Sequence, residues 1–285
     1  MWRYVKREAG LWRIPLLVVV LSGSAVACEP AGGPGDIDGG SDRAEAELAH
    51  GRYLVDNVLL CFNCHSQRDW SLYSGPIVPG GERRGGEVDL FLDPTAAPDI
   101  SPRALRTWSE DDLVAALVQG RDRDGRPFHQ RWMLGNFADL ATADAIAVAR
   151  YLLADASSEI PARSSGGATG AARGAYLVSL GRCELCHGED LGGGSAVAVP
   201  GGESLPAANI SLDVETGVGR LSREEFIDYF KSLSGPEFQR VEVPPDTPNT
   251  AMPWPQFSQM TRDDLGSIYD HLATRAPVRR PVPAP

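Results

Sequence analysis

The chain has 285 residues and a formal net charge of −11. Removing residues 1–27 takes away four basic residues and one acidic residue and leaves a net charge near −14. A charge of this sign and size argues against nucleic acid as a partner and against electrostatic binding to anionic lipid.

The N-terminal segment, residues 1–27, has the pattern of a secretory signal peptide. Basic residues precede an almost wholly apolar run over residues 14–21, and small residues follow it. The run is too short to span a bilayer. We therefore expect export to the periplasm of a bacterial cell.

Cys28 directly follows these small residues and resembles the cysteine of a lipoprotein signal, which becomes the first residue of the mature chain and carries lipid. Ala25 departs from that pattern, because leucine is usual at its position. The alternative is ordinary cleavage after Ala-x-Ala, which would release a soluble periplasmic protein. Four of the five cysteines belong to two other motifs, so the count favours lipidation of Cys28 and a membrane anchor. Residues 28–43, rich in Gly, Pro, Asp and Ser, are then expected to form a flexible tether.

Two Cys-x-x-Cys-His motifs carry the strongest chemical signal in the chain. In an exported protein this pentapeptide attaches c-type haem. The two thiols form thioethers to the porphyrin, and the histidine supplies one axial nitrogen to iron. The sequence therefore predicts two haem c groups, attached through Cys61, Cys64, Cys183 and Cys186 and ligated by His65 and His187.

Zinc binding and thioredoxin-like redox chemistry are the alternative interpretations of these motifs. A structural zinc site needs four converging ligands, and each motif offers at most three, with no second Cys/His cluster nearby. A thioredoxin-like pair follows a strand in a βαβ pattern, and neither motif does. Haem is therefore the favoured cofactor.

Most of the chain is an internal repeat. Each copy has a Gly-x-Tyr-Leu-Val segment before the motif, then a Pro-Gly-Gly-Glu loop, a capping box and a last amphipathic helix. The matching segments are Gly51-Arg-Tyr53 and Gly174-Ala-Tyr176, Pro79–Glu82 and Pro200–Glu203, Asp99–Ser101 and Asn209–Ser211, Ser109–Asp112 and Ser222–Glu225, and Asp144–Leu152 and Asp264–Leu272.

The order of these segments resembles class I cytochromes c, and most closely the di- and tri-haem cytochromes that serve as electron-transfer proteins or dehydrogenase subunits. The resemblance covers roughly residues 44–275 and implies an all-α fold: two tandem class I cytochrome c-like helical domains with long Gly/Pro-rich loops. It also implies that the first and last helices of each domain cross at a glycine facing an aromatic residue. The predicted organisation is domain 1 at 44–155, a linker at 156–171, domain 2 at 172–276 and a Pro-rich tail at 277–285.

Methionine is the usual second axial ligand in this family. Met252 stands in Ala-Met-Pro-Trp-Pro, and its prolines stiffen the loop, so Met252 is the predicted ligand of the second iron. Met133 occupies the equivalent position in the first repeat but lacks the following proline. His129 or an open site are the alternatives for the first iron. Met260, immediately before a capping box, is expected in the core.

Several other polar and aromatic residues have two interpretations each. The tryptophans would either wall a haem pocket or simply pack, and the Asx-Ile-Ser segments would either bond near the haem edge or form ordinary turns. Two histidines have no evident partner and are expected in the core or at the surface. These residues are Trp108 and Trp254, Asp99 with Ser101, Asn209 with Ser211, and His50 and His271.

The function that these features predict is periplasmic electron transfer from a donor, such as a dehydrogenase, to a respiratory acceptor. The polypeptide would make no bonds on a substrate, and an acidic surface would attract redox partners with a basic docking face. A di-haem peroxidase or a thiosulfate-oxidising enzyme is the enzymatic alternative, because domain 1 lacks the Met-Pro pair. A haem-based sensor or a structural module is the remaining class.

Overall fold

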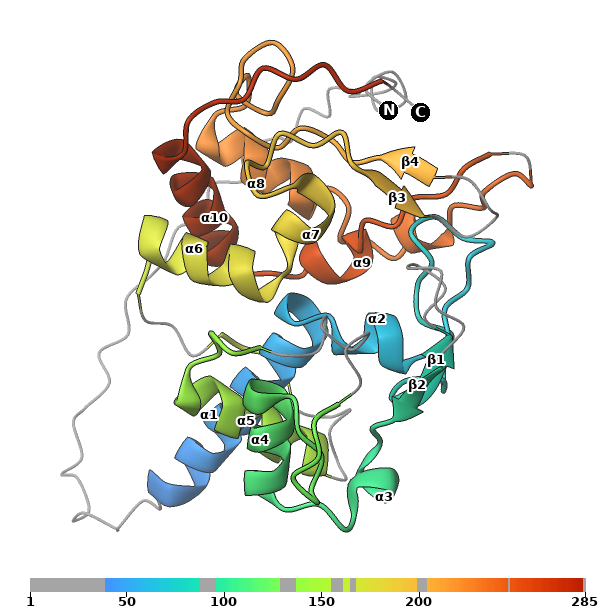
Figure 1. Ribbon diagram of the computed structural model, residues 1–285, viewed down its shortest axis with the longest axis vertical. Helices are drawn as coiled ribbons and strands as arrows, with labels where there is room; N and C mark the ends of the chain where they lie inside the picture. The colour runs from blue at the N-terminus through green and yellow to red at the C-terminus, as the bar shows by residue number, and fades with distance from the viewer. Residues whose placement is uncertain are drawn as a thin grey trace, which may run out of the picture.

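The structure, a computed structural model, describes residues 39–87, 96–128, 137–154, 161–164, 168–198, 204–245 and 247–283 (Figure 1). In the first repeat the elements are α1 (Gly39–Tyr53), the π-helical turn η1 (Leu54–Val58), α2 (Cys61–His65), β1 (Arg84–Glu87), β2 (Ala96–Asp99), α3 (Pro102–Leu105), α4 (Glu110–Gln119) and α5 (Thr142–Leu153). In the second they are α6 (Ala171–Leu180), α7 (Cys183–His187), β3 (Ala196–Ala198), β4 (Ser204–Pro206), α8 (Arg223–Lys231), the 3₁₀ turn η4 (Phe238–Arg240), α9 (Trp254–Phe257) and α10 (Arg262–Thr274).

The expected fold is all-α. The described residues are mainly helical but also form two small sheets, so the fold is not strictly all-α. Two short antiparallel sheets, β1–β2 and β3–β4, close the loops that follow the two Cys-x-x-Cys-His turns. Their strands have only three or four residues and no alternating apolar pattern, so the sequence does not signal them. They form because the loop backbone must find hydrogen-bond partners, which the opposite arm of each loop provides.

Helix α1 begins at Gly39, so the last residues of the segment 28–43, expected to be a tether, form its first turn. Asp42 lies in that turn, where a carboxylate interacts favourably with the helix dipole. The predicted signal peptide and Cys28 lie outside the described residues. Within those residues, no helix is both long and apolar enough to cross a membrane.

Both repeats are built on a crossing of their first and last long helices. A Cβ atom added to Gly51 in α1 would lie 2.0 Å from the carbonyl oxygen of Ala147 and 2.9 Å from Cβ of Tyr151 in α5. At Gly174 in α6 the same atom would lie 1.8 Å from the oxygen of Ser267 and 2.7 Å from Cβ of His271 in α10. Only glycine permits this approach. The expected crossing is present in both repeats; Tyr151 is the expected aromatic residue in the first, whereas His271 takes that place in the second.

The capping boxes predicted for α4 and α8 are present, whereas at α10 only the Thr261 half of the predicted box forms, because the Asp264 side chain bonds to Tyr53 and Arg173 instead. Ser109 and Asp112 form a complete capping box at the start of α4, and Ser222 and Glu225 form the same box at α8. Met260, directly before the Thr261 cap of α10, is only 1% exposed, as expected of a core residue.

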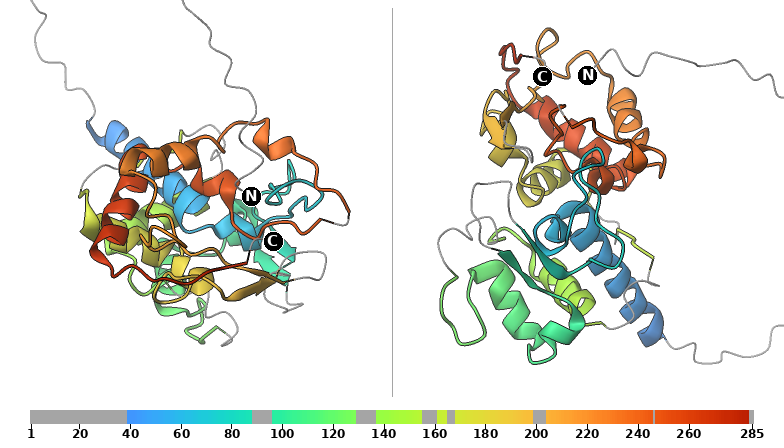
Figure 2. Two further views of the ribbon diagram at one scale, coloured as in Figure 1. Left: turned by 90° about the horizontal axis from the view of Figure 1, so that it is seen from above. Right: turned by 90° about the vertical axis from the view of Figure 1, so that its right-hand side faces the viewer.

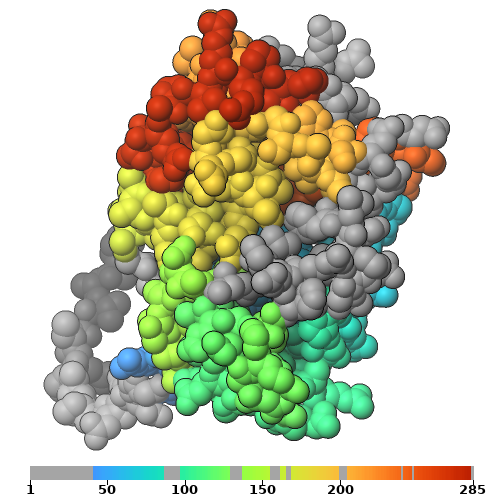
Figure 3. All heavy atoms as spheres, viewed as in Figure 1, coloured from blue at the N-terminus to red at the C-terminus, as the bar shows by residue number. Residues whose placement is uncertain are grey.

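The two repeats stack one on the other, with the second above the first in Figures 1 and 3. Their apolar interiors are continuous, because one cluster of buried residues contains Tyr53, Val58 and Val148 from the first repeat and Leu177 and Leu265 from the second. Burial of this shared apolar surface stabilises the contact between the repeats.

Equivalent tyrosines exchange hydrogen bonds across this contact. Tyr53 donates to Oδ2 of Asp264 in the other repeat at 2.6 Å, and Tyr176 donates to Oδ2 of Asp144 at 2.6 Å. Each phenolic oxygen also accepts, at 3.1 Å, the N–H of the N-cap residue of the helix that carries its aspartate. This residue is Thr261 for Tyr53 and Ala141 for Tyr176. Burial, together with the aspartate, raises the pKa of both tyrosines above its usual range.

The other oxygen of each aspartate is bonded within its own repeat. Nε2 of His50 lies 2.8 Å from Oδ1 of Asp144, and Arg173 donates through Nε to Oδ1 of Asp264 at 2.9 Å. His50 and Arg173 precede the two crossing glycines and are therefore equivalent positions. Although burial disfavours its charge, the bonds from His50 and Tyr176 hold the pKa of Asp144 below the usual value.

Candidate cofactor attachment sites

Each Cys-x-x-Cys-His motif is a single turn of helix, α2 or α7, with the same entry. The preceding residue, Leu60 or Arg182, has a left-handed backbone with φ of 56° or 54°. This residue lies between the preceding helical element and the new turn and is the N-cap of that turn. Two cysteines three positions apart on one helical turn lie on the same face, so both thiols of a motif can reach one planar group.

The two motif histidines are oriented by equivalent hydrogen bonds. Nδ1 of His65 lies 2.8 Å from the carbonyl oxygen of Pro98, and Nδ1 of His187 lies 2.7 Å from that of Ala208. A carbonyl only accepts, so Nδ1 carries the proton and Nε2 keeps its lone pair. Burial lowers the pKa of both rings, which favours the neutral form. A neutral imidazole oriented through Nδ1–H is the form that ligates metal.

The carbonyls that accept these bonds lie just before the two Asx-Ile-Ser segments. Asp99 accepts the N–H of Ser101 at 2.7 Å, and Asn209 accepts the N–H of Ser211 at 3.0 Å. The structure therefore shows the turn chemistry, and bonding near the haem edge stays a prediction. The turns bring the carbonyls to the histidines, a role that the sequence does not show because a backbone carbonyl has no side-chain signature.

All four motif cysteines are free thiols. Burial, followed by the nearby Asp56 carboxylate, raises the pKa of Cys61 to about 12, and burial followed by Cys186 raises that of Cys183 to about 12. Burial also raises the pKa of Cys64 and of Cys186. Thiol–disulfide exchange uses the thiolate, which these surroundings disfavour. No group of three or more His, Cys, Asp or Glu side chains placed to hold a metal occurs among the described residues.

Two buried guanidinium groups lie beside the first motif. Arg83 is 5% exposed and stacks over the ring of Tyr151 at 4.4 Å. Its Nη1 atom, like Nη1 of Arg68, is buried without a hydrogen-bond partner in the described part of the chain. Their charges partly offset the effect of burial on the motif thiols, Arg83 at Cys61 and Arg68 at Cys64, although the pKa of each thiol is still raised. The first site thus has buried cationic donors available to an anionic group.

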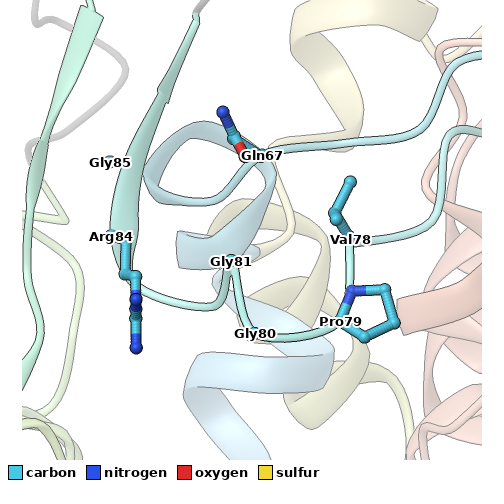
Figure 4. A pocket seen from close by; sticks show the side chains of 7 residues that line it. All are labelled: Gln67, Val78, Pro79, Gly80, Gly81, Arg84 and Gly85. Atoms are coloured by element: carbon cyan, nitrogen blue, oxygen red, sulfur yellow. The ribbon is translucent and has the colours of Figure 1, made fainter.

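A cavity of about 290 Å³ borders the start of β1 (Figure 4). The predicted Pro-Gly-Gly loop forms one side of it; the lining residues are Gln67, Val78, Pro79, Gly80, Gly81, Arg84 and Gly85. Strand β1 packs directly on the end of the motif turn, because a Cβ on Gly86 would lie 2.4 Å from the oxygen of Ser66 and 2.6 Å from that of Cys64.

Met252 is half-buried and packs against the shared apolar core. Its carbonyl accepts a hydrogen bond from Ser74 of the first repeat, and its N–H donates to Oγ1 of Thr250. Met133 and its alternative His129 lie outside the described residues, so both assignments remain predictions.

Trp254, Trp108 and His50 all contact other side chains of the protein. Trp254 packs in an aromatic cluster with Tyr229 and Phe230, with ring centroids 5.6 and 5.3 Å away. Trp108 is half-buried against the core. His50, for which the sequence indicates no partner, pairs with Asp144 and belongs to the contact between the repeats.

About a third of the chain is homologous to cytochrome c subunits of dehydrogenases, while no known family model matches the chain. It is 31% identical over 104 residues to the alcohol dehydrogenase (quinone) cytochrome c subunit of Gluconacetobacter polyoxogenes and, over the same length, to the gluconate 2-dehydrogenase cytochrome c subunit of Pantoea cypripedii. It is 29% identical over 118 residues to the fructose dehydrogenase cytochrome subunit of Gluconobacter japonicus.

These alignments cover 35%, 35% and 40% of this chain. They cover 20%, 22% and 22% of the relatives, so the matched region is about a fifth of their length. The similarity supports a cytochrome c with a role in electron transfer.

Proposed function

We propose that this protein is a di-haem c-type cytochrome that carries electrons between a dehydrogenase and a respiratory acceptor. The observation that carries the proposal is the repeated attachment geometry. Each repeat presents two thiols on one helical turn and a neutral histidine oriented through Nδ1 by a backbone carbonyl. Haem c, when bound, would supply an iron that cycles between Fe(III) and Fe(II).

The residues present fit this cofactor. Thioether formation needs cysteines that are not committed to a disulfide or a metal cluster, and all four are free thiols. His65 and His187 would each offer Nε2 to iron. In the first repeat, the buried Nη1 atoms of Arg68 and Arg83 would pair with the haem propionates, which are anionic and need buried donors.

Met252 is the proposed second axial ligand in the second repeat, and Met133 in the first. A thioether ligand raises the reduction potential relative to a second histidine. The two repeats would each form a class I cytochrome c-like domain, and their stacking would make the pair a relay. The surrounding protein tunes the potentials through burial and hydrogen bonds to the ligands.

Partner and location follow from the comparisons and the charge. The relatives are subunits of dehydrogenases, so we propose a dehydrogenase as donor. An acidic chain favours a partner with a basic docking face. Lipid on Cys28 would hold the protein on the periplasmic side of a membrane. Intact mass of the mature protein and sensitivity to globomycin test this anchor; a form that begins at Cys28 without added mass would contradict it.

The alkaline pyridine spectrum of the purified protein tests the cofactor directly. We expect two c-type haems per polypeptide. One haem would mean that one motif is vacant, and none would end the proposal. Turnover with hydrogen peroxide or thiosulfate by the purified protein would instead favour the enzymatic alternatives.

A further inference from the structure

The loop that follows the first motif leaves its own repeat and packs on the second. This crossing loop, residues 68–78, is closed at its base by a pairing of Arg68 with Ile77 and by a hydrogen bond from the Val78 N–H to the Gln67 oxygen at 2.9 Å. Its cyan trace rises in Figures 1 and 2 to meet the orange and red segments of the second repeat. The loop therefore extends from beside the first motif into the other half of the molecule.

The tip of the crossing loop pairs with the segment that leads to Met252. Tyr73 donates its N–H to the oxygen of Val241 at 2.8 Å, and Val243 donates to the oxygen of Ser71 at 2.8 Å. The Tyr73 ring meets Phe238 edge-on, with centroids 5.0 Å apart. This short antiparallel pairing fixes the direction in which the chain approaches Met252.

Asn249 binds the crossing loop through both ends of its side-chain amide. Nδ2 donates to the oxygens of Trp70 and Leu72 at 3.0 and 2.8 Å, and Oδ1 accepts the N–H of Ser74 at 2.9 Å. Asn249 is only 3% exposed, so these bonds satisfy an amide that is shielded from water. Breaking them would leave several buried polar groups unpaired.

The Ser74 hydroxyl forms hydrogen bonds to the backbone at both ends of the Met252–Trp254 segment. Its Oγ donates to the carbonyl oxygen of Met252 at 2.5 Å and accepts the N–H of Trp254 at 3.1 Å. Ser74 is fully buried and has a left-handed backbone, with φ of 63°. The Met252-Pro253 unit is thus clamped by a side chain from the other repeat.

Arg68 connects this clamp back to the first motif. Its Nε donates to the oxygen of Gly75 and its Nη2 to that of Ser74, both at 2.6 Å, while its guanidinium stacks over Trp70 at 4.1 Å. Arg68 lies three positions after His65. Arg68 and Ser74 therefore link the chain just after the first motif to the segment that contains Met252, the proposed ligand of the second haem.

We infer that Ser74 and Asn249 are positioning residues for Met252, so that the first repeat sets the axial ligation of the second haem. The inference rests on the proposed function, because it takes Met252 as a haem ligand. A mobile sulfur would leave the iron part of the time and admit other ligands. The clamp restricts the backbone of Met252 on both sides and keeps the sulfur in place.

The test uses the full-length holoprotein with Ser74→Gly and Asn249→Ala. Glycine removes the hydroxyl but accepts the left-handed backbone at position 74, so loss of the clamp is separated from loss of fold. Ser71→Ala is the matched control, since the exposed Ser71 hydroxyl donates within the same loop, to Asp69 at 2.5 Å, and has no other hydrogen-bond partner among the described residues. The readouts are the near-infrared sulfur-to-iron band, cyanide binding and the potential of each haem.

We expect both variants to lose part of the sulfur-to-iron band, up to about half, and one haem to bind cyanide about tenfold more readily. The potential of one haem should fall while that of the other is unchanged. Ser71→Ala should match wild type in every readout.

If Ser74→Gly keeps the full band, the wild-type potentials and the wild-type cyanide binding, the inference is overturned while the proposed function stands. If Met252→Ala also leaves the band intact, the ligand assignment and the inference both fail. A wild-type protein without covalent haem would overturn the inference together with the proposed function.

Discussion

The loops that follow the two motifs begin after equivalent helical turns but pack on different repeats. The crossing loop contains Trp70, Tyr73 and Ser74 and packs on the other repeat. The equivalent loop of the second repeat contains Gly192–Gly194 and folds back on its own repeat. Large aromatic side chains provide surface for a contact between repeats, whereas glycines allow close approach within one.

The C-terminal segment holds the second loop in place. Arg280 donates to Asp190 at 2.7 Å and to the oxygen of Gly193 at 3.1 Å, and the oxygen of Val278 accepts from Asn209 at 2.7 Å. Val278 and Arg280, within the segment expected to be a Pro-rich tail, therefore support the turn that orients His187. The loop after the first motif thus contacts the second repeat. The loop after the second motif is instead held by the C-terminal segment of its own repeat.

Removing either pair of motif cysteines is the strongest test of the equivalence of the repeats. Cys61→Ser with Cys64→Ser, and Cys183→Ser with Cys186→Ser, should each reduce the haem content by about half, because each motif would attach its own haem. The pyridine spectrum measures this. If either pair abolishes all haem, attachment in one repeat depends on the other.

Replacing Met252 and Met133 one at a time tests whether each repeat supplies its own second iron ligand. Met252→Ala and Met133→Ala should each remove about half of the sulfur-to-iron band and open one haem to carbon monoxide. Met260→Leu, in the buried core, is the control and should leave the band unchanged. A first haem that binds carbon monoxide in the wild type would contradict the assignment of Met133 and favour peroxidase chemistry there.

The helix crossings offer a comparison in stability. Gly51→Ala and Gly174→Ala should each lower the free energy of unfolding by about 1–3 kcal/mol, because the new methyl group would overlap a backbone carbonyl. Denaturant titration of the holoprotein measures the change. Glu45→Ala on the exposed part of α1 should have almost no effect. Equal stability of the glycine variants and wild type would show that the helices do not cross so closely.

The smallest expected effect concerns Asp144 and pH. Its pKa is held below the usual value of about 4 by His50 and Tyr176, so its stabilising contribution is complete above that value and is lost as pH falls through the lower, folded-state pKa. In Asp144→Asn this part of the acid dependence should be absent. Free energies of unfolding between about pH 5 and pH 2 measure it; identical slopes in the two proteins would contradict the expectation.

Local residue patterns alone identified the two Cys-x-x-Cys-His turns, the repeat, the capping boxes of α4 and α8 and the burial of Met260. The glycine crossings were also predicted, through the resemblance to class I cytochromes c. Each of these features depends on residue type at short spacing or on a pattern written twice in the chain. The chemistry of a Cys-x-x-Cys-His turn or a Ser-x-x-Asp cap is complete within one helical turn, so no distant partner is needed to recognise it.

Only the tertiary structure showed which distant groups complete the sites. The carbonyls of Pro98 and Ala208 orient the histidines, Asp264 pairs with Tyr53 of the other repeat, and Ser74 holds the Met252 segment. Backbone carbonyls have no sequence signature, and a single serine at a left-handed position resembles any turn residue. These contacts join residues far apart in the chain. The carbonyl contacts form when the chain of each repeat folds back on its own motif, and the contacts of Asp264 and Ser74 form when the two repeats pack against one another.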